Sequence, residues 1–288
     1  MIPPVFVIGA SGRSGAALCR ALLAAGTPFV AVVRSAARWQ ATGLPGTPRL
    51  LDLLTPDSAA LTGAARVVSC AHARHAGTIL RNSPAATHVF LGSTRRYSRW
   101  PDPHGDGVRA GEAAFVATGR PGVMLHPTMI YGAEGEDNVQ RLAALLRRLP
   151  VVPLPGGGQS LVQPIHQADL TRCILAALDH AWTGPEVVTV AGPAPVPYAA
   201  FVRAIAAAAG LRAPRIVPVP GAILRALAPL TALPGLPGLP RIGADEIRRL
   251  LEDKAFDIGP MQRMLGIEPM PLEAGLALTF QEYGDARP

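Results

Sequence analysis

The chain has 288 residues, 49% of them hydrophobic, and a formal net charge of +7. A chain of this length and composition can bury a large core, so we expect one large α/β domain, or a large domain with a smaller lobe, and exclude disorder. The basic residues are nearly all arginines that stand singly or in pairs. Because basic and aromatic residues do not alternate, nucleic-acid binding is not predicted. The charge indicates a phosphate-bearing small molecule, unless it reflects only an arginine-rich composition.

Three features limit the class of protein further. Cys19, Cys70 and Cys173 lie in apolar segments without C-x-x-C or His-pair spacing, so they are predicted as core residues and no disulfide framework or metal site is expected. A strand-like run at 4–8 leaves no room for a signal peptide, which predicts a cytoplasmic protein. The apolar segment 216–239 is interrupted by prolines, whereas a membrane-spanning helix needs about 20 continuous apolar residues. No integral membrane segment is therefore predicted, and a peripheral contact of this segment with a membrane or a protein complex is left open.

Short β-branched runs alternate with helical stretches rich in alanine and leucine, which is typical of βαβ units and a parallel sheet. Strands are predicted at 5–9, 29–34, 49–53, 67–71, 88–92 and 123–127, and the helices between them begin near Ser14, Pro56, Arg74 and Gly107. Further along we expect a helix at 137–148, a loop at 153–159, a strand at 162–165, a helix at 167–180 and a strand at 187–191. Helices follow at 198–209, 222–228, 244–252 and 272–283, and the Pro-Gly stretch 234–240 is predicted as an exposed loop.

This order of elements predicts an α/β protein with a Rossmann-type doubly wound parallel sheet and a smaller, mostly helical C-terminal substrate lobe. The predicted NAD(P)-binding Rossmann domain covers residues 1–132, with returns to the sheet from 161–192. Residues 133–288 form the smaller substrate-binding lobe. This lobe is not expected to fold independently, because its chain includes those returns.

The strongest local motif is Gly9-Ala-Ser-Gly12-Arg-Ser-Gly15, which follows the first strand and opens an amphipathic helix. In a dinucleotide site glycines permit a tight turn and a close approach of the backbone to the pyrophosphate, while the N–H groups of the helix N-terminus face its negative charge. The glycines, together with Ser11, Arg13 and Ser14, are therefore predicted to bind a dinucleotide. The alternative is an ordinary turn with a helix cap.

The end of the second strand predicts which dinucleotide is bound. An NAD site usually has an acidic residue there, about 20 positions after the glycines, to hold the ribose 2′-hydroxyl. This chain has Arg34 instead, with Arg38 one turn later. Because an arginine pairs with a 2′-phosphate that a carboxylate would repel, NADP is predicted, with NAD left possible and a solvated strand end as the alternative for Arg34. Three residues at the ends of the next two strands are also predicted to contact the cofactor: Asp52, Leu53 and Ala71.

Several further segments carry the pattern of a known superfamily. They are Leu91-Gly-Ser93-Thr94, Leu125-His-Pro127-Thr128-Met-Ile-Tyr131-Gly132, Pro153-Leu-Pro-Gly-Gly-Gly-Gln159, Gln163-Pro-Ile-His166-Gln-Ala-Asp169-Leu170, Glu252-Asp253-Lys254 and Leu265-Gly266-Ile267. On these segments and the glycine loop, the sequence resembles the extended and atypical short-chain dehydrogenases/reductases, the NAD(P)-dependent epimerase/dehydratase superfamily. Within it the chain looks closest to the branch of the nucleotide-binding accessory subunit of respiratory complex I. The resemblance runs nearly end to end.

The resemblance implies a catalytic Ser or Thr, a Tyr, and a Lys four residues after the Tyr, which lowers the Tyr pKa so that the Tyr can act as a base. Thr94 matches the first position. When Glu112 is aligned with the acidic residue that follows the Lys, the Tyr and Lys positions hold His104 and Val108. His104 is therefore a candidate acid or base, and Tyr97 is another candidate acid, or lines the pocket.

The resemblance also implies contacts around the nicotinamide and the substrate. It places Pro127 and Thr128 near the nicotinamide. His126, Asn138, Gln159 and His166 fall where relatives line a substrate cleft; the alternatives are a buried, hydrogen-bonded role for His126 and a loop brace for His166.

Two functions remain open. The first is an NADP-dependent oxidoreductase, or a nucleotide-sugar epimerase/dehydratase-like enzyme, with an altered Tyr-Lys pair, acting on a nucleotide sugar or another carbonyl compound. The second is a catalytically weak or inactive NADP-binding sensor, or an accessory or assembly protein. The complete nucleotide motif supports the first, while the missing Tyr-Lys pair supports the second, because each positioned acid–base group contributes roughly 10²–10⁴-fold in rate.

Overall fold

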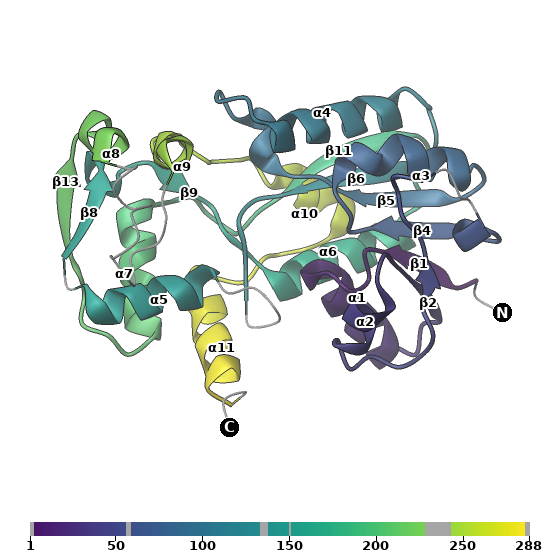
Figure 1. The fold of residues 1–288 in the computed structure, drawn as a ribbon, viewed down its shortest axis with the longest axis horizontal. Helices are drawn as coiled ribbons and strands as arrows, with labels where there is room; N and C mark the ends of the chain where they lie inside the picture. The colour runs from purple at the N-terminus through teal and green to yellow at the C-terminus, as the bar shows by residue number, and fades with distance from the viewer. Residues whose placement is uncertain (1–2, 56–58, 133–137, 150, 228–242, 286–288) are drawn as a thin grey trace.

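The computed structural model describes the chain except residues 1–2, 56–58, 133–137, 150, 228–242 and 286–288. Its centre is a parallel sheet of seven strands in the order β11-β6-β5-β4-β1-β2-β3 (Figure 1). The strands are β1 (Val5–Ile8), β2 (Phe29–Val33), β3 (Arg49–Leu50), β4 (Arg66–Ser69), β5 (Thr87–Leu91), β6 (Gly122–Pro127) and β11 (Pro185–Val190). The α/β class and the Rossmann-type sheet predicted from the sequence are confirmed.

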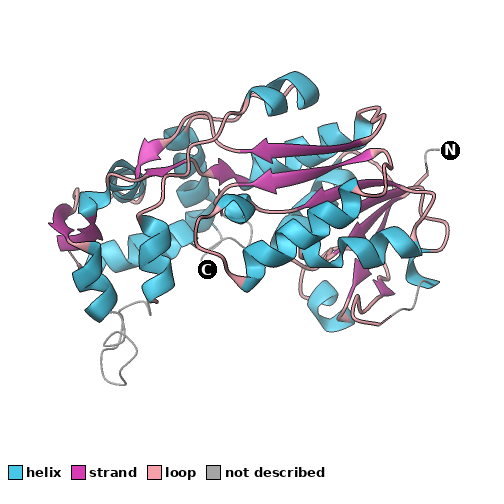
Figure 2. Ribbon diagram, turned by 90° about the horizontal axis from the view of Figure 1, so that it is seen from above, coloured by secondary structure: helices cyan, strands magenta, loops and turns pink. Residues whose placement is uncertain are grey.

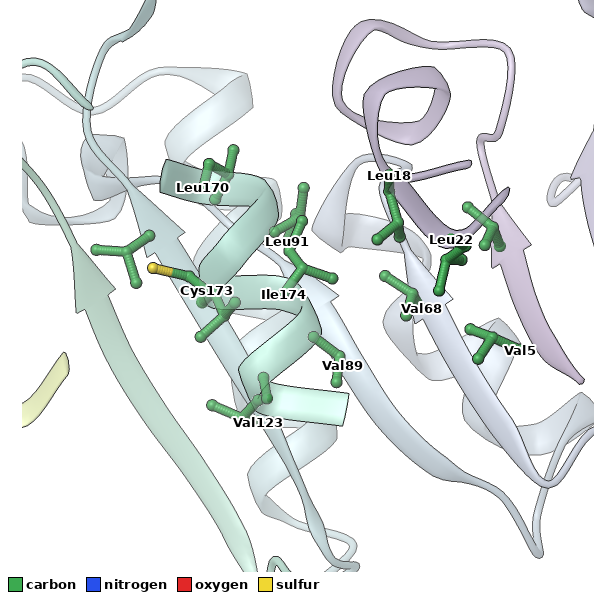
Figure 3. Close-up of a cluster of buried hydrophobic side chains, with 14 of the residues drawn as sticks. Val5, Leu18, Leu22, Val68, Val89, Leu91, Val123, Leu170, Cys173 and Ile174 are labelled. Carbon is green, nitrogen blue, oxygen red and sulfur yellow. The ribbon is translucent and has the colours of Figure 1, made fainter. Parts of the chain in front are cut away.

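Helices cover both faces of the sheet, which explains why its strands are apolar on both sides. Alternate residues of β1 point to opposite faces: Val5 and Val7 belong to one buried cluster, and Phe6 and Ile8 belong to another. The first cluster is closed by α1 (Arg13–Ala24), α6 (Gln167–Asp179) and α10 (Gly259–Leu265), and the second by α3 (Ala76–Asn82) and α4 (Pro103–Val116). Figure 3 shows side chains of α1 and α6 packed over the strands.

The remaining elements build a second lobe beside the sheet (Figure 1). Its own buried cluster includes Val139, Leu154, Phe201 and Leu276. These residues come from four segments: α5 (Asn138–Arg148), β8 (Val151–Pro155), α7 (Tyr198–Ala208) and α11 (Leu272–Asp285). The lobe also holds β13 (Arg215–Val219), α8 (Gly221–Leu227) and α9 (Ala244–Leu250). Strands of the sheet point toward this lobe, so their carboxyl ends face it (Figure 2).

Short elements connect the two parts. Strand β7 (Ile130–Tyr131) pairs with β10 (Ile165–His166), and β9 (Leu161–Val162) pairs with β12 (Val196–Pro197). Helix α2 (Ala36–Gln40) follows β2, and four 3-10 turns are described: η1 (Ala59–Leu61), η2 (Ala73–His75), η3 (Thr94–Tyr97) and η4 (Gly156–Gly158). Within the described residues, no helix is both long enough and apolar enough to cross a membrane.

Several predicted elements differ from the structure, among them the strand expected at 162–165, which is two short strands, β9 and β10. Residues 153–155 form part of β8, which pairs with β13, rather than a loop. Helix α4 begins at Pro103, four residues before the predicted start, because Asp102 caps it by accepting from the N–H of Gly105 at 2.8 Å. The start predicted near Pro56 lies outside the described residues, and only the 3-10 turn η1 follows it. The predicted loop 234–240 also lies outside them.

Candidate functional site

The order of the strands creates a crevice at one end of the sheet. The chain runs from β1 outward through β2 and β3 and then returns to β4 on the other side of β1. In open parallel sheets ligands bind at the carboxyl ends of the strands at such a switch point. A cleft of about 400 Å³ opens there. Its lining comes from the loop after β1 and the ends of β2, β3 and β4: Ile8, Gly9, Ser11, Gly12, Val32, Val33, Arg34, Ser35, Arg38, Leu51, Asp52, Leu53, Leu54, Cys70, Ala71, His72, Arg74 and His75.

The glycine loop has a backbone that side chains would block. Gly9 has a φ of +76°, and a Cβ there would lie 3.1 Å from the backbone nitrogen of Ala71. A Cβ at Gly15 would lie 2.2 Å from the carbonyl oxygen of Gly9, so this turn can close against α1 only with glycine. Gly12 is the N-cap of α1, and as a glycine it has no side chain with which to cap the helix. The first N–H groups of α1 therefore remain available to an anion.

Positive side chains surround the far part of the cleft. Arg34 and Arg38 flank Ser35, whose hydroxyl accepts from the N–H of Arg38 at 3.4 Å. Both arginines are exposed, and neither forms an ion pair with a carboxylate among the described residues. Arg74 and His75 line the same cleft from the segment after β4. The cleft thus combines an anion-binding helix terminus with a second cationic region.

Of the other residues predicted to contact the cofactor, some line the cleft and some lie beside it in the first turn of α1. Asp52, Leu53 and Ala71 line the cleft, and Asp52 also accepts from the N–H of Leu54 at 3.0 Å. Ser14, in the first turn of α1, donates to Gln167 at 3.2 Å, which ties the helix to α6. Arg13 begins α1 next to Gly12.

In the segment after β4, three lining residues were not among the predicted cofactor contacts: His72, Arg74 and His75. Their position directly after β4, the neighbour of β1, was the available signal. Cys70 is partly buried and packs against the first core cluster, whereas Cys19 and Cys173 are buried within it.

The candidate catalytic residues Thr94 and Tyr97 lie in η3, directly after β5. The Thr94 hydroxyl donates to the carbonyl oxygen of Pro127 at 3.2 Å, which connects the ends of β5 and β6. Tyr97 is 46% exposed, and its hydroxyl lies 3.4 Å from that of Thr189. The centroid of the Tyr97 ring lies 5.7 Å from that of Phe256, which is in the segment between α9 and α10. Tyr97 therefore presents an accessible phenol between the sheet and the C-terminal segment.

His104 and Val108, which the resemblance aligns with the Tyr-Lys pair, both lie on α4. Nδ1 of His104 lies 3.1 Å from Nε2 of His72. Val108 is 1% exposed and packs in the cluster between the sheet, α3 and α4. The single lysine of the chain, Lys254, donates through Nζ to the backbone carbonyls of Arg249 and Glu252. Burial lowers the pKa of Lys254.

Glu112, in the second half of α4, bonds to side chains of two neighbouring segments. It forms an ion pair with Arg96 at 2.8 Å and accepts a hydrogen bond from Nε2 of His126 at 2.6 Å. His126 is fully buried, and its Nδ1 accepts from the N–H of Ser93 at 3.0 Å. Burial lowers the pKa of His126, against the opposing effect of Glu112. Both ring nitrogens are engaged, so His126 holds the loop after β5 rather than facing a cleft.

The remaining predicted substrate and nicotinamide residues are dispersed. Asn138 donates to the carbonyl oxygen of Ile130 at 2.6 Å and accepts from the N–H of Val139. His166 is 5% exposed, caps α6 and lies 3.3 Å from the hydroxyl of Thr279. Gln159 is exposed.

Thr128 is 8% exposed and donates to the carbonyl oxygen of Gln163 at 2.5 Å. Pro127 ends β6, where its carbonyl meets Thr94. The structure thus does not gather the predicted substrate residues into one cluster.

Solved structures share this fold over nearly the whole chain. MoeE5, solved in complex with UDP-glucuronic acid and NAD, has a TM-score of 0.72 and 19% identity, covering 99% of this chain and 100% of that one. UDP-glucuronic acid 4-epimerase from Bacillus cereus, in complex with UDP-glucuronic acid and NAD, has a TM-score of 0.71 and 16% identity, covering 99% and 100%. TunA, an NAD-dependent NDP-hexosamine 5,6-dehydratase, has a TM-score of 0.70 and 16% identity, covering 99% and 98%.

No family model and no curated protein sequence matches the chain. At these identities the structural similarities establish the fold. Two of these neighbours are described as an epimerase and a dehydratase, in line with the wider resemblance seen in the sequence, and the narrower likeness to the complex I branch stays a prediction.

Proposed function

We propose that this protein is an NADP-dependent oxidoreductase of the short-chain dehydrogenase type with a rebuilt catalytic site. The observation that carries the proposal is the cradle formed by Gly9, Gly15 and the uncapped N-terminus of α1 at the switch point of the sheet. Added Cβ atoms would fill this cradle, and an anion would face the N–H groups of the first turn of α1, so the residues fit a dinucleotide pyrophosphate. The bound dinucleotide would supply the hydride chemistry.

The preference for NADP rests on the charges at the end of β2. Arg34 and Arg38 stand in the cleft wall without a carboxylate partner among the described residues, and Arg74 faces the same cleft from the end of β4. A 2′-phosphate would bring two negative charges into this region, where guanidinium groups form charge-assisted hydrogen bonds with phosphate oxygens. The fold neighbours named above were solved with NAD or described as NAD-dependent, so the arginines are what distinguishes this proposal from theirs.

The proposed substrate is a nucleotide sugar or another carbonyl compound. Two of the fold neighbours were solved with UDP-glucuronic acid, which supports this class. The second lobe stands at the carboxyl ends of the strands, where a substrate would meet the cofactor (Figure 1). Glu252 fixes this arrangement by accepting from the hydroxyl of Ser98 at 2.8 Å and from the N–H of Arg99 at 2.6 Å.

Calorimetric titration with NADPH and NADH tests the cofactor. We expect tighter binding of NADPH and a loss of about tenfold or more in NADPH affinity in Arg34→Ala, since one charge-assisted bond contributes about 1.5–3 kcal/mol. NADH binding should change little. Arg203→Ala, an exposed arginine on α7, is the matched control. Equal affinities for both nucleotides in the wild type would refute the NADP preference, and no binding of either would refute the nucleotide site.

A second function is favoured by one observation, the burial of Val108 at the position of the catalytic lysine. A binding protein without turnover, acting as a redox sensor or an accessory factor, needs the nucleotide cradle but not the acid–base pair. Absorbance at 340 nm with a panel of carbonyl compounds, including nucleotide sugars, separates the two functions. Oxidation of bound NADPH by any of them supports the enzyme, and tight NADPH binding without oxidation supports the sensor.

A further inference from the structure

Two histidines from distant segments meet at the edge of the nucleotide cleft. His72 follows β4 and lines the cleft, and His104 lies in the first turn of α4. Nε2 of His72 is 3.1 Å from Nδ1 of His104, with ring centroids 4.4 Å apart and ring planes at 77°. The pyrophosphate cradle does not involve this contact, so the cofactor site does not explain it.

The hydrogen bonds around the pair determine where its protons lie. The N–H of Arg74 donates to Nδ1 of His72 at 3.1 Å, so that nitrogen must present a lone pair. A neutral His72 therefore carries its proton on Nε2 and donates it to Nδ1 of His104. His104 in turn must carry its own proton on Nε2. Among the described residues, no hydrogen bond occupies that Nε2–H.

Two glycines of α4 allow the two histidine rings to meet. The helix contains Gly107 and Gly111, although a glycine inside a helix costs about 1 kcal/mol relative to alanine. A Cβ at Gly107 would lie 2.8 Å from Cε1 of His72, and one at Gly111 would lie 1.9 Å from the carbonyl oxygen of Ala73. Both glycines thus face the segment that carries His72. Their absence of side chains allows α4 to approach this segment closely enough for the two rings to meet.

The surroundings keep both rings neutral. Burial lowers the pKa of His72 to about 4, with further lowering by the charges of His104, Arg74 and His75. Burial also lowers the pKa of His104, and the neighbouring arginines 95 and 74 act in the same direction against the carboxylate of Asp102. The geometry agrees, because a proton on Nδ1 of His72 would oppose the N–H of Arg74.

We propose that His72 is a positioning residue that holds His104 in the tautomer with its proton on Nε2, and that His104 thereby supplies a fixed hydrogen-bond donor to an oxygen of the substrate. The second half of this inference rests on the proposed function, since the resemblance places His104 at the position of the catalytic tyrosine. A neutral imidazole can polarise a carbonyl in this way without giving up its proton, provided that its tautomer and orientation are fixed beforehand.

Nitrogen-15 NMR of the histidine side chains tests the tautomer without cofactor or substrate. In the wild type we expect a protonated-type Nε2 and an unprotonated-type Nδ1 for His104. In His72→Phe the donor is lost while a ring is retained, so the two nitrogen shifts of His104 should move toward each other and its pKa should rise. His72→Gln, whose amide N–H can replace the Nε2–H donor, should restore the wild-type pattern. Gly107→Ala should act like His72→Phe, because its Cβ displaces the His72 ring.

The control is Gly77→Ala in α3, where a Cβ would make only ordinary contacts, with the Arg81 side chain at 3.5 Å and the Cβ of Ala114 at 3.8 Å. A proton on Nδ1 of His104 in the wild type, or an unchanged His104 spectrum in His72→Phe, would overturn the positioning role. With a carbonyl substrate in hand, His104→Phe should lower kcat by about 10²-fold, as the loss of one transition-state donor does. His72→Phe should lower kcat by less, with KM nearly unchanged in both. Failure of NADPH to bind would refute the proposed function but would not affect the NMR test of the His104 tautomer.

Discussion

We expect His88 to make the free energy of unfolding fall as the pH becomes acidic. It is fully buried, and its Nε2 lies 2.9 Å from the hydroxyl of Ser83, which itself donates to the carbonyl oxygen of Ile79. Nδ1 is buried without a partner among the described residues. The Ser83 hydroxyl therefore accepts from a neutral His88. Burial, followed by the charge of Arg120, lowers the pKa of His88 from 6.5 to about 4.

The sign of the effect follows from this lowered pKa. As the pH falls below 6.5, the unfolded chain takes up a proton at His88 that the folded chain refuses until about pH 4. Stability is therefore lost across this window and not above it. At roughly 1.4 kcal/mol per pKa unit, His88 accounts for about 3 kcal/mol of that loss.

Urea unfolding at a series of pH values from 7 to 4 provides the assay. We expect His88→Phe, which keeps a buried ring beside Phe90, to lose about 3 kcal/mol less over this range than the wild type. Phe90→Leu is the control, because it removes a packed ring but no titrating group and should lower stability equally at every pH. The same loss in His88→Phe as in the wild type would refute the argument from burial.

Two further predictions concern the site. Gly15→Ala should weaken NADPH binding by about tenfold or more in calorimetry, because its Cβ would lie 2.2 Å from the carbonyl oxygen of Gly9, while Gly184→Ala, where a Cβ meets nothing within 4 Å, should bind normally. Val108→Lys should lower the free energy of unfolding by about 3 kcal/mol or more and should not restore activity, because it places an unpaired charge in an apolar cluster; a stable and more active variant would contradict the assigned packing.

The sheet and the glycine loop could be predicted because their signals are local. The apolar runs of β1 and β2 are continuous, as buried parallel strands require, and Gly9 and Gly15 stand between the first strand and its helix. The local turn rules failed at β8, where Pro153 and Pro155 predict a loop. Residues two apart in a strand direct their N–H groups to the same edge, and within the described part of the chain β8 pairs with β13 alone, so both prolines can occupy the open edge.

The side-chain contacts of the site could not be predicted because they join separate βα units. The His72–His104 contact links residues 32 positions apart, and Glu112 reaches His126 on the next strand. Position in a motif left two roles open for both His126 and His166: lining a substrate cleft, or hydrogen bonding within the protein. Both rings are buried, at 0% and 5% exposure, and both form hydrogen bonds within the protein, which favours the second role. A residue's place in the chain thus indicated which strand end it occupies, but not whether its polar atoms are already bonded to the protein.

The hydrogen bonds already made within the protein reduce the number of side chains that could donate a proton or a hydrogen bond to a substrate. Thr94 gives its hydroxyl to the carbonyl of Pro127, His126 uses both nitrogens, and Lys254 donates to backbone carbonyls. Among the described residues, no hydrogen bond joins the side-chain donor of Tyr97 or of His104 to the backbone. Tyr97 is half exposed beside Thr189, whereas His104 is held by His72, so only His104 has a partner that fixes its proton. If the protein catalyses a reaction, the donor whose orientation is set before the substrate binds can contribute most to the rate. Such a donor needs the least reorganisation during the reaction.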